Sequence, residues 1–495
     1  MASSVFLVIY LSLGALFLQQ IAQAFYNVFF SPLRKIPGPW YASITGIPKL
    51  YNAIIRRKQS RWSHDMHKKY GQYVRVAPDE VLIDDVVAFR EVHRMGTHFL
   101  KTKIYKFLNP TPPGQPPYGL FQETDPVRHS NVRRMVSRGF SLGYLRTNWE
   151  GTVHERVKAV VEGMKKEAVS NHGEVDIYKW WPLMAGDVIS TLMFGECPHA
   201  VEQGLDDELI AGYKLNDAGN GFAYSFPYIY HILKWLPIPS LKRAWAGNPV
   251  LIERGKRAVE NSREVSQKAN IFATVLAEAE RDDPTLSDFE IALNAGVLVF
   301  AGTDTTATSL TYLVWAVLSN PSLMQDLENE VAQLQPPYTD EKLESLPVLN
   351  AVIKETLRLY GAAPAPLPRY VPREGAVLGG YYFPAGTTVA TQAWTLHRNP
   401  KVFENPEVFD HKRWLGGLAS REEVKASWAP YGAGSRICIG MHLADMELRM
   451  ATAAFFREFR GAKLAASTTP ESMEVDNTFL IEPHGHACRV VLPTK

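Results

Sequence analysis

This chain of 495 residues contains few cysteines and carries little net charge. Only Cys197, Cys438 and Cys488 occur, and an odd number of widely spaced cysteines argues against a disulfide framework and for a reducing compartment. The formal net charge is +2 and no long basic run is present, so the sequence predicts no nucleic-acid partner. A cysteine in such a chain is therefore considered first as a reactive or metal-binding residue.

Charge is also missing from the N-terminus. No charged residue precedes Arg34, and the stretch from Val5 to Leu18 is almost wholly apolar. A membrane-spanning helix needs about 20 mostly apolar residues, and residues 1–30 provide them. Arg34 and Lys35 follow directly, which favours the cytoplasmic side for the rest of the chain. We expect residues 1–30 to form a single-pass membrane anchor in contact with lipid.

A cleaved signal peptide is the alternative for this segment. Ala22-Gln23-Ala24 fits a cleavage site of the small-x-small type, but the positively charged region expected ahead of the apolar run is missing. After the anchor, the prolines of Ile36-Pro37-Gly38-Pro39-Trp40 predict a stiff joint without helix. The predicted organisation is an anchor at 1–30, a proline-rich hinge at 31–50 and one catalytic domain at 51–495.

One long helix is predicted in the centre of the chain. Ser287-Asp288-Phe289-Glu290 forms a capping box, apolar residues continue to Leu318, and Asn320-Pro321 ends the pattern. A helix that is apolar on nearly all sides is expected to cross the protein interior. Within it, Ala301 to Thr306 contains a glycine, three threonines and an aspartate, which are poor choices for a buried helix unless they have a function.

Shorter elements surround this helix in the prediction. Residues 73–76 and 81–83 alternate as a hairpin, and residues 377–390 read as short strands and turns. A second helix is expected from Pro347 to Gly361, and a third from about Gly440 to Phe459. The expected fold class is mainly α with small β-sheets.

The segment Tyr431 to Gly440 is the most informative in the sequence. Glycines such as Gly434 let a loop turn tightly and approach a flat ligand. Arg436 offers a forked cation suited to a carboxylate. Cys438 stands just before the predicted helix, where N–H groups and the helix dipole favour a thiolate. This arrangement predicts a cysteine that ligates a metal.

The same segment resembles the cysteine loop of the cytochrome P450 family, F-x-x-G-x-R-x-C-x-G. Gly434, Arg436, Cys438 and Gly440 match it, and Tyr431 replaces the phenylalanine with a hydroxylated ring. Four further family motifs stand in family order along the whole chain. They are His129-x-x-x-Arg133-Arg134, Ala301-Gly302-x-Asp304-Thr305, Glu355-x-x-Arg358 and Arg413-Trp414. His411 and Lys412 depart from the positions ahead of the last motif, and His129 stands where tryptophan is common.

The resemblance implies a cytochrome P450 fold with a long central distal helix and an N-terminal transmembrane helix. It implies a monooxygenase that uses O2 and electrons from NADPH, supplied by a membrane-bound NADPH-cytochrome reductase. The cofactor would be heme b, iron protoporphyrin IX, and the substrate an apolar small molecule of fungal secondary metabolism. The expected location is the endoplasmic reticulum membrane, with the catalytic domain cytoplasmic.

The resemblance also implies roles for individual residues. Cys438 would be the iron ligand, Asp304 and Thr305 would deliver protons, and a helix irregularity at Gly302 would make room for O2. The cofactor would be bound by His129, Arg133, Arg369, Arg436, Gly434 and Gly440. Glu355, Arg358 and Arg413 would form a charge network that holds the cysteine loop.

Simpler readings stand beside these roles. Glu355 and Arg358 fit an exposed helix pair, and the hydroxyls of Thr305 and Thr306 fit bonds to the preceding turn. His484, His486 and Cys488 alternate on one strand face, but a zinc site normally needs a fourth ligand. The aromatic stretch 222–235 fits a substrate lid or a membrane-dipping loop, and 100–120 and 362–367 are candidate pocket segments.

Two other functions compete with oxygen activation. A heme-thiolate lyase or isomerase rearranges peroxides and dispenses with an acid–alcohol pair such as Asp304-Thr305. A membrane protein that only binds heme or lipid needs no such pair either. The pair therefore favours the monooxygenase.

Overall fold

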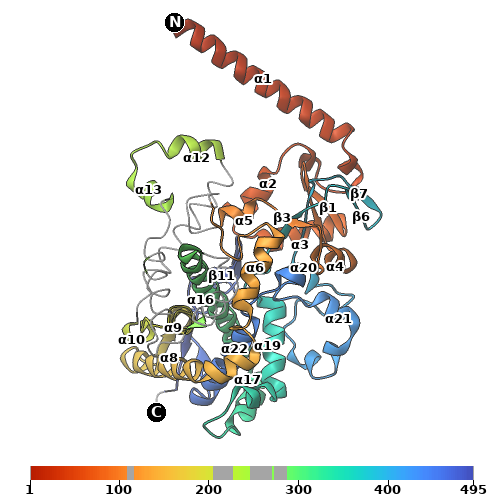
Figure 1. The fold of residues 1–495 in the computed structure, drawn as a ribbon. Coiled ribbons are helices and arrows are strands. Elements are labelled where there is room, and N and C mark those ends of the chain that lie inside the picture. The colour runs from red at the N-terminus through yellow and green to blue at the C-terminus, as the bar shows by residue number, and fades with distance from the viewer. Residues whose placement is uncertain are drawn as a thin grey trace. The chain divides into compact units, whose positions relative to one another are not determined.

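The computed structural model of the chain describes residues 2–108, 116–204, 227–245, 253, 270–271 and 287–493. Residues 109–115 of one candidate pocket segment and 222–226 of the predicted lid lie outside the described residues. The chain divides into two compact units, one built from Met1–Thr102 with Ala365–Leu396 and the other from Lys103–Pro364 with His397–Lys495. Helices dominate and the sheets are small, which confirms the predicted fold class (Figure 1).

The first unit contains one long helix and a five-stranded sheet. The helix α1 spans Ala2–Phe29, and no helix of the described residues meets both the length and the hydropathy needed to cross a membrane. The sheet has the strand order β1-β2-β8-β5-β3. Its strands are β1 (Tyr73–Ala77), β2 (Glu80–Ile83), β3 (Leu100–Lys101), β5 (Leu367–Tyr370) and β8 (Thr388–Thr391).

The predicted hairpin is confirmed, since β1 and β2 pair antiparallel with Val74 opposite Leu82. The predicted strands of 377–390 are confirmed as β6, β7 and β8, of which β6 and β7 form their own two-stranded sheet. The remaining elements of this unit are β6 (Ala376–Leu378), β7 (Tyr381–Phe383), η1 (Pro32–Lys35), η2 (Trp40–Ser43), α2 (Ile47–Leu50), η3 (Tyr51–Ile55), α3 (Gln59–Tyr70), α4 (Val86–His93) and α20 (Ala393–Leu396).

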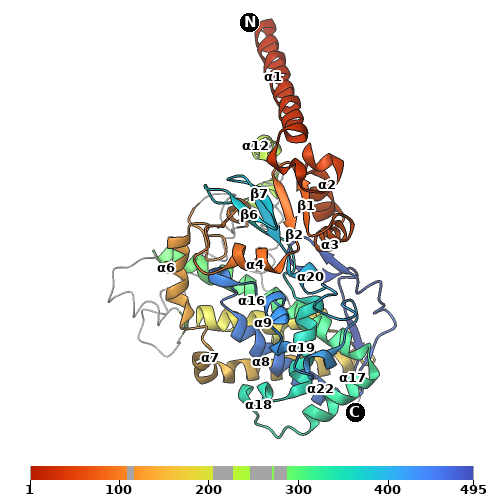
Figure 2. The same cartoon turned by 90° about the vertical axis from the view of Figure 1, so that its right-hand side faces the viewer.

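The second unit is built around α16, which spans Asp288–Leu318. Ser287 and Glu290 form the predicted capping box, because each side chain bonds the backbone of the other residue. The helix packs against α9 (Ile177–Phe194), α19 (Pro347–Tyr360) and α22 (Met441–Glu458) (Figures 1 and 2). Most side chains along α16 are buried, so the prediction of an interior helix is confirmed.

The other helices of the second unit enclose this group. α8 (Glu150–Ser170) packs on α9 and α22, and α17 (Pro321–Ala332) packs on α19 and α22. Further elements are α5 (Ile104–Phe107), α6 (Pro126–Ser137), α7 (Leu142–Asn148), α10 (Ala200–Gln203), α12 (Pro227–Leu233), α13 (Pro239–Trp245), α18 (Asp340–Glu344), η4 (His411–Trp414), η5 (Leu418–Ser420), α21 (Glu422–Ser427) and η6 (Gly434–Arg436). Its small strands are β4 (Glu174–Asp176), β9 (Lys463–Leu464), β10 (Val475–Asn477), β11 (Ile481–Pro483) and β12 (Arg489–Val491).

Candidate functional site

The cysteine loop is closed by its own backbone. The Cys438 N–H donates to the Tyr431 carbonyl at 2.8 Å, and the Ile437 N–H donates to the Gly434 carbonyl at 3.2 Å. Gly434 has φ of 61°, a left-handed conformation in which a β-carbon is disfavoured. Cys438 stands three residues before Met441, the first residue of α22, so the sequence-based position of the cysteine ahead of a helix is confirmed.

The environment of the Cys438 thiol differs from the expectation of a low pKa. Burial raises the pKa of the thiol, against the lowering effects of the Gly440 N–H and the Arg133 guanidinium. Yet the side chain is exposed. A group that is surrounded by protein and still accessible faces open space within the fold. The Gly440 N–H and the Arg133 guanidinium thus favour a thiolate at this position, and burial opposes it.

Two predicted cofactor residues stand on α6 next to this loop. The Arg133 guanidinium donates to the Ile437 carbonyl at 2.8 Å, one residue before the cysteine. Burial lowers the pKa of Arg133, and the opposing charge of Cys438 raises it. His129 is buried one helical turn earlier, so both residues share a face of α6. Arg436 donates to the Glu123 carbonyl at 2.8 Å, which fixes the other side of the loop.

The predicted proton-delivery residues lie on a stretch of α16 whose side chains are partly accessible. The helix is buried on both sides of this stretch, but Ala301 is exposed and Asp304 and Thr305 are partly exposed. Ala301 and Thr305 are four residues apart and therefore share a helix face. The Thr305 hydroxyl donates to the Ala301 carbonyl at 2.7 Å, which is the back-bonded arrangement anticipated as the simpler reading.

Gly302 has a packing role that the sequence did not predict. A β-carbon at this position would lie 2.8 Å from Cγ1 of Ile189 on α9, closer than side chains approach. The helix α16 continues without a break through Gly302, so the irregularity expected there is absent. The glycine permits the close crossing of α16 and α9, because its missing β-carbon leaves room for the Ile189 side chain.

The Glu355 carboxylate is the centre of a buried network on α19. It accepts bonds from the Arg358 guanidinium at 2.8 and 2.9 Å, from Arg413 Nε at 3.1 Å and from Trp414 Nε1 at 2.8 Å. The Asp410 N–H donates to it at 2.8 Å. Burial acts to raise the pKa of Glu355, but these donors lower it overall. Glu355 and Arg358 are fully buried, so the reading as an exposed helix pair is wrong.

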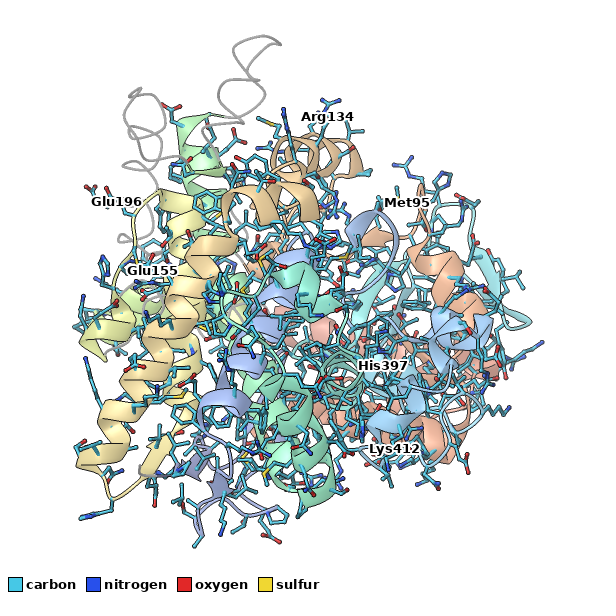
Figure 3. The ribbon with its side chains drawn as sticks, turned by 90° about the horizontal axis from the view of Figure 1, so that it is seen from below. Met95, Arg134, Glu155, Glu196, His397 and Lys412 are labelled. Atoms are coloured by element: carbon cyan, nitrogen blue, oxygen red, sulfur yellow. The ribbon has the colours of Figure 1, made fainter. Side chains whose placement is uncertain are left out.

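His397, which is labelled in Figure 3, connects this network to the start of the cysteine loop, and sequence reasoning did not identify it. Its Nδ1 bonds the Arg358 carbonyl at 3.0 Å, and its Nε2 accepts the Ala429 N–H at 2.9 Å. Because Nε2 accepts, Nδ1 carries the proton and the ring is neutral. Burial and, to a smaller extent, the neighbouring Arg358 charge lower the pKa of His397 to about 3. Arg358 also donates to the His397 carbonyl at 2.8 Å, so the link is reciprocal.

Tyr431 joins the cysteine loop to α22. Its hydroxyl donates to the Asp445 carboxylate at 2.5 Å. Burial raises the pKa of Tyr431 well above its ordinary value, and the Asp445 charge acts in the same direction. The sequence showed only that a hydroxyl replaces a hydrogen on the ring; its partner stands fourteen residues away in the chain and was not predicted.

The residues around Cys438 fit a flat, acidic metal cofactor. The thiol faces open space, two guanidinium groups flank its loop, and the exposed stretch of α16 belongs to the same unit. A cysteine can bind iron as a thiolate, and guanidinium groups suit carboxylates. Arg369 is buried in the other unit, where its guanidinium donates to the Pro368 carbonyl at 2.9 Å.

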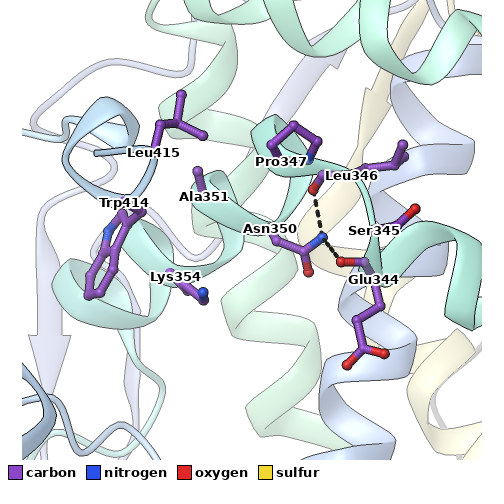
Figure 4. A pocket seen from close by; sticks show the side chains of 9 residues that line it. All are labelled: Glu344, Ser345, Leu346, Pro347, Asn350, Ala351, Lys354, Trp414 and Leu415. Carbon is purple, nitrogen blue, oxygen red and sulfur yellow. Dashed lines mark hydrogen bonds between the residues drawn. The ribbon is translucent and has the colours of Figure 1, made fainter. Parts of the chain in front are cut away.

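Two other places were compared with this site. An open pocket at the start of α19 is lined by residues of 344–354 with Trp414 and Leu415, and Asn350 bonds the Leu346 and Glu344 carbonyls there (Figure 4). It contains no cysteine or histidine.

On the C-terminal strands, His484 pairs with Asp476 and His486 with Glu482. Within the described ranges, no group of three His, Cys, Asp or Glu side chains could hold a metal ion.

Comparison with known proteins agrees with this geometry. Residues 38–488 match the family model described as Cytochrome P450. The chain is 40% identical over 489 residues to cytochrome P450 monooxygenase aflV of Aspergillus parasiticus, covering 97% of this chain and 95% of the relative. It is 40% identical over 478 residues to cytochrome P450 monooxygenase stcB of Emericella nidulans, covering 95% and 91%. Methylphloroacetophenone oxidase of Cladonia uncialis is 34% identical over 406 residues, covering 78% and 86%.

Both full-length matches carry the name monooxygenase, which confirms the prediction of oxygen activation over the lyase and the non-catalytic alternatives. The family implies a heme cofactor, a redox partner, O2 and a small-molecule substrate. The geometry of the cysteine loop and the family match lead to the same conclusion. The chain belongs to the cytochrome P450 family and is a monooxygenase.

Proposed function

We propose that the protein binds heme b and oxidises an apolar small molecule of fungal secondary metabolism, with electrons that an NADPH-cytochrome reductase supplies. The relatives come from Aspergillus, Emericella and Cladonia, and the last is named for the oxidation of methylphloroacetophenone, an aromatic ketone. An aromatic substrate of that kind suits the largely apolar surroundings of α16.

One observation carries this proposal. Cys438 is surrounded by protein, exposed to interior space and held in a loop that Arg133 and Arg436 fix from two sides. When bound, a heme iron with a thiolate ligand supplies O2 activation and oxygen transfer to carbon. The protein's own contribution is to hold the thiol in place, to neutralise carboxylates with its two arginines, and to limit the access of water.

Asp304 and Thr305 are proposed to pass protons from solvent to the oxygen that is being activated. The Thr305 hydroxyl is accessible, but it donates to the Ala301 carbonyl. Its lone pairs can accept a bond from water while this donation persists, and passing a proton on requires the hydroxyl to rotate. Asp304 precedes it on the helix and is partly exposed, so its carboxylate can exchange protons with solvent.

The ligand assignment has a direct spectroscopic test. The reduced protein with carbon monoxide should show the red-shifted Soret band of a thiolate ligand. Cys438→Ala should abolish that band, whereas Cys197→Ala, a matched change in the same unit, should preserve it. A red-shifted band that survives Cys438→Ala, or a spectrum of nitrogen ligation in the parent protein, contradicts the proposal.

The proton-delivery role has its own prediction. Thr305→Ala should uncouple NADPH consumption from product, and the electrons should appear as hydrogen peroxide. Thr303→Ala is the matched control, because Thr303 is buried and makes the same back-bond, to the Val299 carbonyl at 2.8 Å. General acid–base groups contribute roughly 100-fold or more to rate, so product formation should drop by a comparable factor. Equal coupling in both variants would count against the route through Thr305.

We also propose that α1 is a single-pass anchor in the endoplasmic reticulum membrane with the catalytic domain on the cytoplasmic side. Its 28 residues extend roughly 42 Å as a helix, more than the roughly 30 Å of a bilayer core. Arg34 and Lys35 follow its end, as expected for a cytoplasmic flank. Deletion of residues 1–30 should turn a protein that resists alkaline extraction from membranes into one that is extracted, with heme retained; loss of heme would contradict the boundary.

A further inference from the structure

Glu123 is a buried carboxylate next to the cysteine loop, with no part in the proposed chemistry. Its side chain is 5% exposed, and its backbone carbonyl accepts the Arg436 guanidinium at 2.8 Å. Burying a carboxylate is costly unless polar or charged partners compensate. The partners of the Glu123 side chain therefore determine how firmly the carbonyl that binds Arg436 is placed.

Two groups compensate the Glu123 carboxylate. One oxygen accepts the Asp125 N–H at 2.8 Å, and the other lies 3.3 Å from Nε of Arg128. Arg128 stands in the first turn of α6, where the Asp125 side chain accepts its N–H at 2.7 Å. Of these two partners, only the guanidinium carries a charge, so Arg128 balances the charge of the buried carboxylate.

The same guanidinium also pairs with a second carboxylate, that of Glu290 at the start of α16. Glu290 is the capping-box residue of this helix, and it accepts the N–H and the hydroxyl of Ser287, both at 2.9 Å. Glu290 would therefore retain two donors if Arg128 were removed, whereas the buried Glu123 would retain the Asp125 N–H and lose its cation. The loss of Arg128 should affect Glu123 more than Glu290.

A short segment connects these contacts with the interior of the second unit. We name it the bridging segment 118–125. Its Leu120 N–H donates to the Asn294 side chain on α16 at 2.7 Å, and a β-carbon on Gly119 would lie 2.9 Å from Cγ2 of Val297 on the same helix. The bridging segment is therefore packed on α16 at one end, and its Glu123 carbonyl binds the cysteine loop at the other.

We propose that Arg128 is a positioning residue for the cofactor. Its ion pairs with Glu123 and Glu290 hold the bridging segment 118–125 between α16 and the cysteine loop, and the segment in turn keeps Arg436 in place to bind a cofactor carboxylate. This role rests on the proposed function, in which Arg436 neutralises such a carboxylate. The contacts therefore join the start of the distal helix to the loop of the metal ligand through three charged side chains.

The test measures the transfer of heme from the full heme-loaded chain to an excess of apomyoglobin, followed by absorbance. Arg128→Gln should release heme about fivefold faster, because a partly exposed ion pair changes an equilibrium by up to about that factor. Arg128→Lys should restore part of the slow release, since an ammonium can still pair with Glu123. A role in which Arg128 only fills space predicts no difference between the two variants.

Two further measurements test whether Arg128 acts through Arg436 and through charge. In an Arg436→Gln background, Arg128→Gln should add little to the rate of release, because the residue that it positions is already missing. High salt should accelerate release from the parent protein and have less effect on Arg128→Gln, because Arg128 is 47% exposed and its ion pairs are screened.

Lys165→Gln is the matched control. Lys165 is 39% exposed, lies in the same unit and likewise bridges two carboxylates, those of Glu162 and Glu458, both at 2.9 Å. This variant should release heme at the rate of the parent protein. Release from Arg128→Gln at the parent rate overturns the proposal, as does equally fast release from Lys165→Gln or a fully additive effect with Arg436→Gln.

The salt dependence of the parent protein decides the question even if Arg128→Gln does not fold, because release that is independent of salt overturns the proposal. The carbon monoxide spectrum separates this failure from that of the proposed function. A parent protein without the red-shifted Soret band contradicts the proposed function itself. A parent protein with that band, whose Arg128→Gln variant releases heme at an unchanged rate, contradicts only the role of Arg128.

Discussion

At the scale of single residues, the one departure of the cysteine loop from the family pattern has a structural consequence. Tyr431 places a hydroxyl against the half-buried Asp445 carboxylate, whose pKa is raised by burial and lowered by this bond. Tyr431→Phe would leave the carboxylate without that donor. We expect a loss of about 1 kcal/mol in the free energy of unfolding, because the half-buried carboxylate loses a hydrogen-bond partner.

Urea unfolding followed by heme absorbance measures this loss. Tyr382→Phe is the control, because Tyr382 is exposed and the same hydroxyl is removed. If the two variants were equally stable, the Tyr431–Asp445 bond would contribute nothing to holding the loop. A loss confined to Tyr431→Phe would show that the extra hydroxyl joins the loop to α22.

At the scale of elements, the crossing of α16 and α9 depends on Gly302. Gly302→Ala would place a methyl group 2.8 Å from Ile189 Cγ1. Overpacking of this kind costs about 1–3 kcal/mol, and the better helix propensity of alanine returns at most about 1 kcal/mol. We therefore expect a lower midpoint of unfolding in Gly302→Ala.

A double-mutant cycle with Ile189→Ala separates this effect from helix propensity. The second change removes the clashing Cγ1, so the two substitutions together should cost less than the sum of each alone. Additive costs would indicate that the helices separate without strain, and the packing role of Gly302 would be wrong.

The network on α19 predicts a larger effect. Glu355→Gln would leave the buried guanidinium groups of Arg358 and Arg413 without their carboxylate. Breaking a buried pair from one side costs about 3–5 kcal/mol, so we expect little heme-loaded protein at 37 °C. Glu422→Gln is a control with an exposed carboxylate. The ratio of heme absorbance to protein absorbance after purification measures the outcome; equal loading would contradict the role of the network.

At the scale of the whole molecule, buried neutral histidines should limit stability in acid. Burial lowers the pKa of His67 to about 4 and that of His397 to about 3, both below the ordinary value of 6.5. Between these values and 6.5 the unfolded chain binds protons that the folded protein does not. Stability therefore decreases as the pH falls through this window, by about 1.4 kcal/mol per pH unit for each histidine.

The thermal midpoint measured from pH 7 to pH 4 tests this expectation. His67→Asn removes one titrating group while retaining a donor for the Gly71 carbonyl, and should reduce the slope. Glu447 has the opposite effect. Burial raises the pKa of its carboxyl group, so the contribution of this group to the stability of the folded protein decreases as the pH rises above 4.5. A slope that is unchanged in His67→Asn would show that this histidine is not held neutral.

Much of the molecule was predictable because local chemistry sets it. The capping box at Ser287, the proline at 347 and the hairpin around residues 77–80 determined their elements through interactions among near neighbours in sequence. The cysteine loop was equally predictable, because its glycine, arginine and cysteine residues lie close together in sequence and serve one ligand. The sequence by itself therefore determined the fold class and the enzyme family.

Only the tertiary structure decided what depends on distant parts of the chain. The raised pKa of the Cys438 thiol results from burial by many segments, and it outweighs the local N–H groups on which the sequence argument relied. The contact of Gly302 with Ile189 and the bridge through His397 likewise join residues whose spacing in sequence carries no signal. Packing and desolvation act through space, so no local pattern could have specified them.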